Sequence, residues 1–245
     1  MNQIKDHLKK YGYYLNYSFD DNECSNALLR LLGKSEYKMF WKLVDEASIN
    51  KNIDTEQFIR NYFVKNPKAI KILTSGQIAI SVSILESIIK NILEDIEYID
   101  IRRVLELGGS DGWAADFLLQ NISKIQKIDI VDKNYENKKL NTKIEIFKNN
   151  YADFESAEKY DLIFSILGAP ALMLDEMINC LNKNVLNNTI IYIALRLQPY
   201  EYTEFQKRMN LNNFISYKNG IDRIFTNLDL GGQTIPLFKF KHIHQ

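Results

Sequence analysis

The chain has 245 residues, of which 46% are hydrophobic and 25% are charged, and its formal net charge is zero. This length suits one large domain, or one domain with a helical addition, and the hydrophobic fraction is enough for a full core. A balanced charge argues against a protein that relies on long-range attraction to nucleic acid or to an anionic membrane, so neither is expected as a partner.

The N-terminal residues 1–6 do not form a signal peptide, because no apolar core follows the charged residues. No apolar run approaches the roughly 20 residues that a membrane span needs. The cytoplasm is therefore the expected compartment.

Residues 1–100 are predicted to contain helices only, on the basis of cap residues and apolar positions three or four residues apart. The predicted helices are 21–32 with Gly33 as its left-handed end, one capped by Ser35, one capped by Asp54 with Gln57 three residues on, a short one from Pro67, and a long one capped by Thr74 or Ser75.

After residue 100 the pattern changes to short apolar strands that alternate with helices. Strands are predicted at 103–107, 128–131, 144–147, 161–166 and 189–195, with helices at 113–120, 171–181 and 200–209. Strand-like pieces at 214–217, 222–227 and 235–241 are too closely connected for crossovers and are expected to be antiparallel. The predicted fold class is α/β: a doubly wound, mostly parallel seven-stranded sheet with an antiparallel C-terminal edge, preceded by an all-helical region. The predicted domains are 1–100 and 101–245.

A glycine-rich turn joins the first predicted strand to the next helix, and it is the most informative segment of the sequence. It reads Glu106-Leu107-Gly108-Gly109-Ser110-Asp111-Gly112. Glycines allow close approach of a ligand, and the helix start directs free N–H groups at it. A dinucleotide fingerprint starting at Gly108 would need glycine where Ser110 and Trp113 stand, so a pyrophosphate ligand is disfavoured.

The acidic residue before the turn resembles motif I of the class I S-adenosylmethionine-dependent methyltransferases, roughly E/D-x-G-x-G-x-G. The departure is Ser110 in place of the middle glycine. The resemblance implies that Glu106 and the backbone of Gly108 and Gly112 hold the methionine end of the cofactor. The alternative is an ordinary glycine-rich connection between a strand and a helix.

Asp132 ends the second strand, about 20 residues beyond the last turn glycine, where a carboxylate can accept from ribose hydroxyl groups. The alternative is a solvated turn residue beside Lys133. The segment 150–154 resembles the family element in which an acid, here Asp153, accepts from the adenine amino group beside an apolar neighbour. An acid that only caps the following turn remains the alternative for Asp153.

Residues 159–170 resemble the family's fourth strand, which opens with a Y-D-L-I element and ends at the reaction centre. The similarity extends over about residues 75–245. The predicted cofactor-binding set is Glu106, Gly108, Gly109, Ser110, Gly112, Asp132, Lys133, Ala152, Asp153, Phe154 and Ser165.

The candidate catalytic or positioning residues are Tyr11, Tyr14, Ser165 and Arg196. Tyrosine rings from the N-terminal segment could cover the positively charged sulfonium, although packing against the core is the alternative. Arg196 interrupts an apolar run and could pair with a substrate carboxylate, or form a structural ion pair. No histidine lies near the predicted ends of the fourth and fifth strands, so a histidine base is not expected unless His7 folds over the site.

The two cysteines, Cys24 and Cys180, form no Cys-x-x-Cys pair, and no histidine stands at metal-ligand spacing from them, so no metal is expected. The leading interpretation is a methyltransferase acting on a small molecule, with the helical region as a substrate cover and a homodimer contact. Two alternatives remain: an enzyme that transfers or cyclises the aminocarboxypropyl arm of S-adenosylmethionine, and a non-catalytic binding or scaffold protein.

Overall fold

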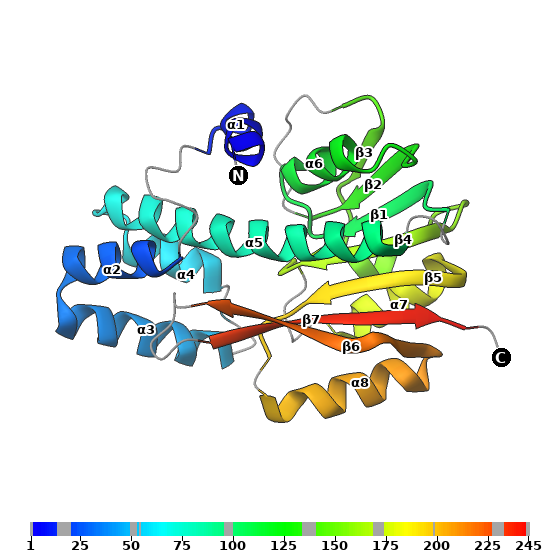
Figure 1. The fold of residues 1–245 in the computed structure, drawn as a ribbon. Helices are drawn as coiled ribbons and strands as arrows, with labels where there is room; N and C mark the ends of the chain where they lie inside the picture. The colour runs from blue at the N-terminus through cyan, green and yellow to red at the C-terminus, as the bar shows by residue number, and fades with distance from the viewer. Residues whose placement is uncertain are drawn as a thin grey trace. The chain divides into compact units, whose positions relative to one another are not determined.

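A computed structural model describes residues 2–13, 21–49, 53, 55–95, 100–133, 141–168, 174–197, 199–226 and 233–243. The chain forms two compact units. The sheet unit comprises Met1–Tyr11, Ser83–Ile224 and Ile235–Gln245, and the helical unit comprises Gly12–Val82 and Phe225–Thr234. The boundary between the units lies within a long helix, α5 (Figure 1), rather than near residue 100. The predicted roles of the helical region remain predictions.

The helical unit contains α2 (Asp21–Leu32), α3 (Lys34–Ile49), α4 (Thr55–Tyr62) and the first part of α5 (Pro67–Asp95). Gly33 ends α2 with a φ of 78°, and its N–H donates to the carbonyl of Leu29, as a left-handed helix end requires. The predicted cap at Ser35 is wrong, because α3 begins at Lys34 and Ser35 lies inside it. The predicted cap Asp54 lies outside the described residues.

Helix α5 corrects the prediction of two separate helices, because it runs without a break over 29 residues. The Ser75 hydroxyl does not cap a new helix; it donates to the carbonyl of Lys71, four residues earlier, within the same helix. Of the described helices, only Pro67–Glu94 is long and apolar enough to cross a membrane by length and composition, and 67% of its most apolar window is buried. A core helix of a globular protein has the same properties.

The sheet has seven strands in the order β3-β2-β1-β4-β5-β7-β6 (Figure 1). The strands are β1 (Arg103–Leu107), β2 (Lys127–Val131), β3 (Ile144–Phe147), β4 (Tyr160–Ile166), β5 (Val185–Ala194), β6 (Phe214–Thr226) and β7 (Gln233–His242). The first five pair in parallel, and β7 pairs antiparallel with β5. The predicted fold class is therefore confirmed. The order reverses between β1 and β4, which makes their carboxyl ends the switch point where ligands bind in open α/β sheets.

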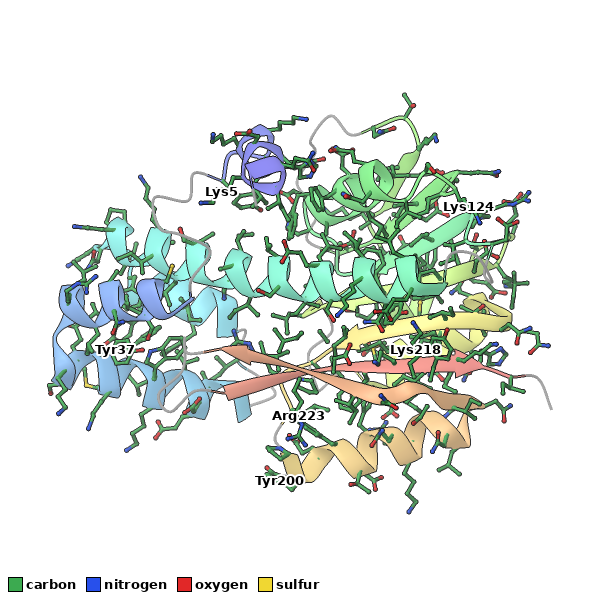
Figure 2. The ribbon with its side chains drawn as sticks, in the orientation of Figure 1. Lys5, Tyr37, Lys124, Tyr200, Lys218 and Arg223 are labelled. Atoms are coloured by element: carbon green, nitrogen blue, oxygen red, sulfur yellow. The ribbon has the colours of Figure 1, made fainter. Side chains whose placement is uncertain are left out.

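One strand prediction is wrong: the pieces at 214–217 and 222–227 belong to a single strand, β6. Lys218, Asn219 and Gly220 all have positive φ, so the backbone is irregular there without ending the strand. Lys218, labelled in Figure 2, also ties β6 to the second half of α5, because its ammonium group donates to the carbonyl of Asn91 and contacts Glu94 at 3.2 Å.

Helices cover both faces of the sheet. The elements of this unit outside the strands are α1 (Asn2–Lys10), α6 (Trp113–Asn121), η1 (Tyr151–Asp153), α7 (Leu174–Asn184), η3 (Pro199–Glu201) and α8 (Tyr202–Leu211). Leu105 and Leu107 of β1 belong to a buried cluster with Met177 of α7 and Phe205 of α8. Because side chains alternate along a strand, Glu106 points to the opposite face, where α6 lies.

Candidate functional site

The turn between β1 and α6 depends on backbone conformations that glycine adopts without strain. Gly108 and Gly112 have φ of 76° and 79°, and the Gly112 N–H closes the turn on the carbonyl of Gly109 at 2.8 Å. Helix α6 begins at Trp113, and Gly112 before it provides no side-chain cap. The first N–H groups of α6 therefore lie at the carboxyl end of the sheet, as the sequence predicts.

Ser110, the departure from the methyltransferase pattern, adopts a φ of 48° that is unusual for a residue with a side chain. Its N–H donates to the carboxylate of Asp132 at 2.8 Å. This bond joins the turn to the end of β2 and stabilises the strained conformation. Two predicted cofactor residues are thus brought together, and Lys133 beside them is exposed.

The glycine backbones are closely packed. A Cβ on Gly109 would lie 2.6 Å from the carboxyl carbon of Glu106 and 2.7 Å from Cγ2 of Ile130. A Cβ on Gly108 would lie 2.4 Å from the Cα of Gly168, which follows β4. The ends of β1 and β4 therefore touch through two glycines, and the sequence pattern did not single out Gly168.

Glu106 is the most unusual ionisable group of the site. Its side chain is 2% exposed, and its Oε2 atom is buried with no hydrogen-bond partner. Burial, together with the negative charges of Asp111 and Asp132, raises the pKa of the Glu106 carboxyl to about 8, although the N–H of Ala115 opposes the shift. An unpartnered buried carboxyl destabilises a fold, so it is a recognised mark of a ligand site.

The segment after β3 lies beside this turn. The Tyr151 hydroxyl donates to the carbonyl of Gly168 at 2.7 Å, and so it connects η1 to the end of β4. Burial is also the main cause that raises the pKa of Tyr151, followed by the charge of Asp132. Sequence reasoning missed Tyr151, because a tyrosine one residue from a turn carries no pattern of its own.

The predicted adenine-binding residues lie in different surroundings. Asp153 is exposed and accepts a 3.5 Å bond from the Asn150 amide, while the carbonyl of Ala152 accepts from Lys183. Phe154 is 2% exposed and packs against Phe147 with tilted rings at 5.1 Å between ring centres, and it belongs to the core cluster. Asp153 is therefore accessible to a ligand at this edge, whereas Phe154 is covered.

Ser165 and Arg196 also differ in exposure. Ser165 is completely buried, and its hydroxyl donates to the carbonyl of Leu107 at 2.9 Å, which links β4 to β1. Arg196 follows β5 and is exposed. Ser165 thus supports the strand ends from within, whereas Arg196 lies at the surface.

Helix α1 brings Tyr11 and His7 next to α6. The Tyr11 hydroxyl donates to Asp116 at 2.9 Å, and His7 Nε2 donates to the carbonyl of Trp113 at 2.8 Å. Gln120 bridges the two, because its amide contacts both His7 Nδ1 and Asp116. Burial, followed by Asp116, raises the pKa of Tyr11, with smaller effects from Asp111 and Glu106. The predicted partner Tyr14 lies outside the described residues.

Two cavities are described, and neither borders the glycine turn. One of about 630 Å³ lies between α1, α5 and α6, against Ile4, Ile89 and Phe117. The other, of about 560 Å³, lies between α8 and β6. Within the described residues, no three His, Cys, Asp or Glu side chains are arranged to hold a metal ion. The chemistry of the glycine turn, rather than cavity size, therefore marks it as the candidate site.

The chain matches no protein-family model and no curated protein sequence. Solved structures are similar to it. Magnesium protoporphyrin IX methyltransferase from Synechocystis PCC 6803, crystallised with S-adenosylmethionine, aligns over 79% of this chain and 99% of its own, with a TM-score of 0.54 and 12% identity. The 1,6-didemethyltoxoflavin-N1-methyltransferase of Burkholderia thailandensis, crystallised with S-adenosylhomocysteine, aligns over 76% and 88%, with a TM-score of 0.54 and 10% identity. The chain therefore has the fold of the Rossmann-like class I methyltransferases, as the sequence predicts.

Proposed function

We propose that this protein is an S-adenosylmethionine-dependent methyltransferase that acts on a small-molecule acceptor. The observation that carries the proposal is the buried Glu106 carboxyl, whose Oε2 atom has no partner, directly beneath a glycine turn at the switch point of a methyltransferase fold. A ligand with a cationic amino group, such as the methionine end of the cofactor, would satisfy this oxygen.

The residues of the turn fit the cofactor in chemistry as well as in position. Glu106 supplies a buried acceptor, Gly108 and Gly112 supply backbone that a ligand can approach, and Asp132 supplies a carboxylate at the end of β2. Asp153 lies at the same carboxyl edge and is exposed. These residues would hold the methionine, ribose and adenine parts respectively.

S-adenosylmethionine, when bound, supplies a methyl group on a positively charged sulfur that is already a good leaving group. The protein then has to orient the acceptor and exclude water, which can contribute roughly 7–11 kcal/mol to lowering a barrier. Tyr11 is the best placed described residue for this, because it is half-buried beside the first turn of α6 and close enough to feel the charge of Glu106. Arg196 is exposed and supplies a cation for an acidic acceptor.

Further parts of the proposal rest on the sequence. The balanced net charge supports a small molecule, rather than nucleic acid or a membrane surface, as the partner. The cytoplasm is the compartment that this proposal includes. A homodimer contact through the helical unit completes the proposal.

Mass spectrometry of the protein incubated with S-adenosylmethionine and a cell extract tests the reaction. We expect S-adenosylhomocysteine to accumulate together with a product about 14 mass units heavier than its acceptor, which is the mass of one added CH₂ group. Methylthioadenosine in its place would show transfer or cyclisation of the aminocarboxypropyl arm. If neither by-product forms and calorimetry detects no binding of S-adenosylmethionine at millimolar concentration, the result would support the non-catalytic scaffold protein instead.

A further inference from the structure

Three carboxyl groups from three different segments meet at the glycine turn, and we call Glu106, Asp111 and Asp132 the acid cluster. Glu106 comes from β1, Asp111 from the turn itself, and Asp132 is the residue directly after β2. Glu106 and Asp111 are 2% and 4% exposed. The Oε2 atom of Glu106 is the cluster's unpartnered buried atom, so the cluster has an unmet need for a hydrogen-bond donor or a cation.

The charged groups that act on Glu106 all have the same sign. Asp111 and Asp132 both raise its pKa, and the one opposing influence is the neutral N–H of Ala115. Two tyrosines interact electrostatically with Glu106: Tyr11, which directly follows α1 and bonds to Asp116 of α6, and Tyr151 of η1.

Other charged groups of the neighbouring elements are directed elsewhere. Asp161 of β4 accepts from the N–H groups of Arg102 and Arg103, at the opposite end of the sheet. Lys133, next to Asp132, is exposed. The described surroundings of Glu106 therefore favour its neutral, protonated form until a cation arrives.

We propose that the acid cluster binds the cationic amino group of the cofactor only as Glu106 loses its proton to solvent, so that cofactor binding releases a proton. The inference rests on the proposed function. In the ligand-free protein the Glu106 oxygen carries the proton. In the complex the O–H bond is broken, the proton passes to buffer, and the carboxylate pairs with the ligand's ammonium group, which stays protonated. The affinity then depends on pH even though the ligand itself does not change its charge.

Calorimetry with S-adenosylhomocysteine measures this coupling directly. At pH 7, titrations in two buffers with different protonation enthalpies should give a binding enthalpy that depends on the buffer and corresponds to release of about one proton. Between pH 6 and pH 7 the affinity should rise about tenfold, because the deprotonated fraction of Glu106 rises about tenfold while the ligand's amino group, which titrates near 8, stays mostly charged. 5′-Methylthioadenosine lacks the amino-acid arm, so it should release no proton and bind equally at both pH values.

Two variants assign the proton to Glu106. Glu106→Gln keeps the shape of the side chain, removes the titrating group, and should abolish both the proton release and the pH dependence. Asp111→Asn leaves Glu106 in place and removes one neighbouring charge, so the pH dependence should move to lower pH. Glu145→Gln is the matched control: it removes a carboxylate from β3 that pairs with Lys127 outside the site, and it should behave as the wild type.

The outcomes separate this inference from the proposed function. If S-adenosylhomocysteine does not bind at millimolar concentration at any pH, the proposed function itself fails. If it binds without proton release, or if Glu106→Gln still releases a proton, the proposed function stands and the coupling through Glu106 is wrong. Should Glu106→Gln not fold, the buffer dependence of the wild type and the shift in Asp111→Asn still decide the question.

Discussion

At the scale of single residues, Glu106 and Asp132 carry the candidate site by different means. Glu106 is buried with an unpartnered oxygen, whereas Asp132 is half-buried and accepts the N–H of Ser110. The unpartnered Glu106 carboxyl destabilises the ligand-free fold until a ligand supplies a partner. The Asp132 carboxylate already stabilises the turn through its hydrogen bond. Substitutions at the two positions should therefore have opposite effects on stability.

Glu106→Gln should stabilise the ligand-free protein at neutral pH. The folded protein keeps the Glu106 proton up to a pKa of about 8, while the unfolded chain loses it near its ordinary value, so wild-type stability falls as pH rises between those values. At pH 7.5 the variant should gain about 1–3 kcal/mol in the free energy of unfolding. Urea titrations at pH 5 and 7.5 measure this, and an equal gain at both pH values would contradict the explanation.

Asp132→Ala should weaken binding of S-adenosylhomocysteine by at least about tenfold, because hydrogen bonds to a charged acceptor contribute about 1.5–3 kcal/mol each. Asp132→Asn keeps an acceptor for the Ser110 N–H, so it separates the loss of the carboxylate from the loss of the turn. Asp175→Ala, an exposed acid on α7, is the control. Dissociation constants from calorimetry decide the result, and an unchanged value in Asp132→Ala would assign the ribose contact to another residue.

At the scale of elements, the site depends on how the ends of β1, β4 and α1 fit together. Gly108 and Gly168 bring the two strand ends into contact, and Tyr151 and Ser165 hold that arrangement through bonds to backbone carbonyls. Helix α1 is attached to α6 by His7 and Tyr11. The glycine contact and the α1 attachment each allow a test.

Gly168→Ala should be strongly destabilising, since its Cβ would lie 2.3 Å from the carbonyl oxygen of Leu107, a backbone atom that cannot rotate away. Overpacking of this kind costs about 1–3 kcal/mol. Gly220→Ala in the same unit is the matched comparison, because its nearest contact is the Ser216 hydroxyl at 3.2 Å and its cost comes from a φ of 75°. Thermal unfolding should show the larger loss for Gly168→Ala; an equal or smaller loss would mean that the strand ends separate easily.

Tyr11→Ala should lower turnover more than it lowers cofactor affinity, because Tyr11 directly follows α1 and its hydroxyl is bonded to Asp116 of α6. Tyr11→Phe keeps the ring and removes that bond, so it measures the contribution of the hydroxyl alone. Formation of S-adenosylhomocysteine with cell extract and calorimetric affinity should be measured on the same samples, with melting temperatures as the check on folding. Full turnover in a folded Tyr11→Ala protein would assign the ring to packing.

At the scale of the whole molecule, the sheet topology determines where the ligand site lies, and the net charge determines which charged partners the surface attracts. The parallel order of the sheet places the carboxyl ends of β1 and β4 together, and this makes a ligand site independent of the total charge. The net charge of zero decides instead what the surface attracts.

Binding to mixed DNA or RNA should be negligible at physiological salt, because few phosphate charges can be neutralised by a chain without net positive charge. Fluorescence anisotropy with labelled single-stranded and double-stranded oligonucleotides at several salt concentrations measures it. Tight binding that weakens steeply with added salt would favour a nucleic acid as the acceptor in place of a small molecule.

The sequence by itself determined the sheet and the turn. Apolar runs in the strands, glycines at the turn and an acid before it are local signals, so β1 to β5, α6 and the position of Glu106 could be predicted from residue types and spacing. The same local reasoning placed a helix start at Ser75, where the hydroxyl bonds within an unbroken helix. It also divided β6 at Gly220, because it could not show that the strand continues through the irregular residues.

Only the tertiary structure decided which groups meet. Gly168 is 60 positions from Gly108, and Tyr151 is 45 positions from Glu106, roughly the length of one or two βα units. No sequence periodicity connects these residues. Parallel strand pairing brings them to the same edge of the sheet. The exposure of each predicted residue was decided in the same way: Phe154 and Ser165 are covered by neighbouring strands and helices, while Asp153 and Arg196 are left at the surface. The raised pKa of Glu106 has the same origin, because burial and the charges of Asp111 and Asp132 arise only when β1, the turn and β2 lie together.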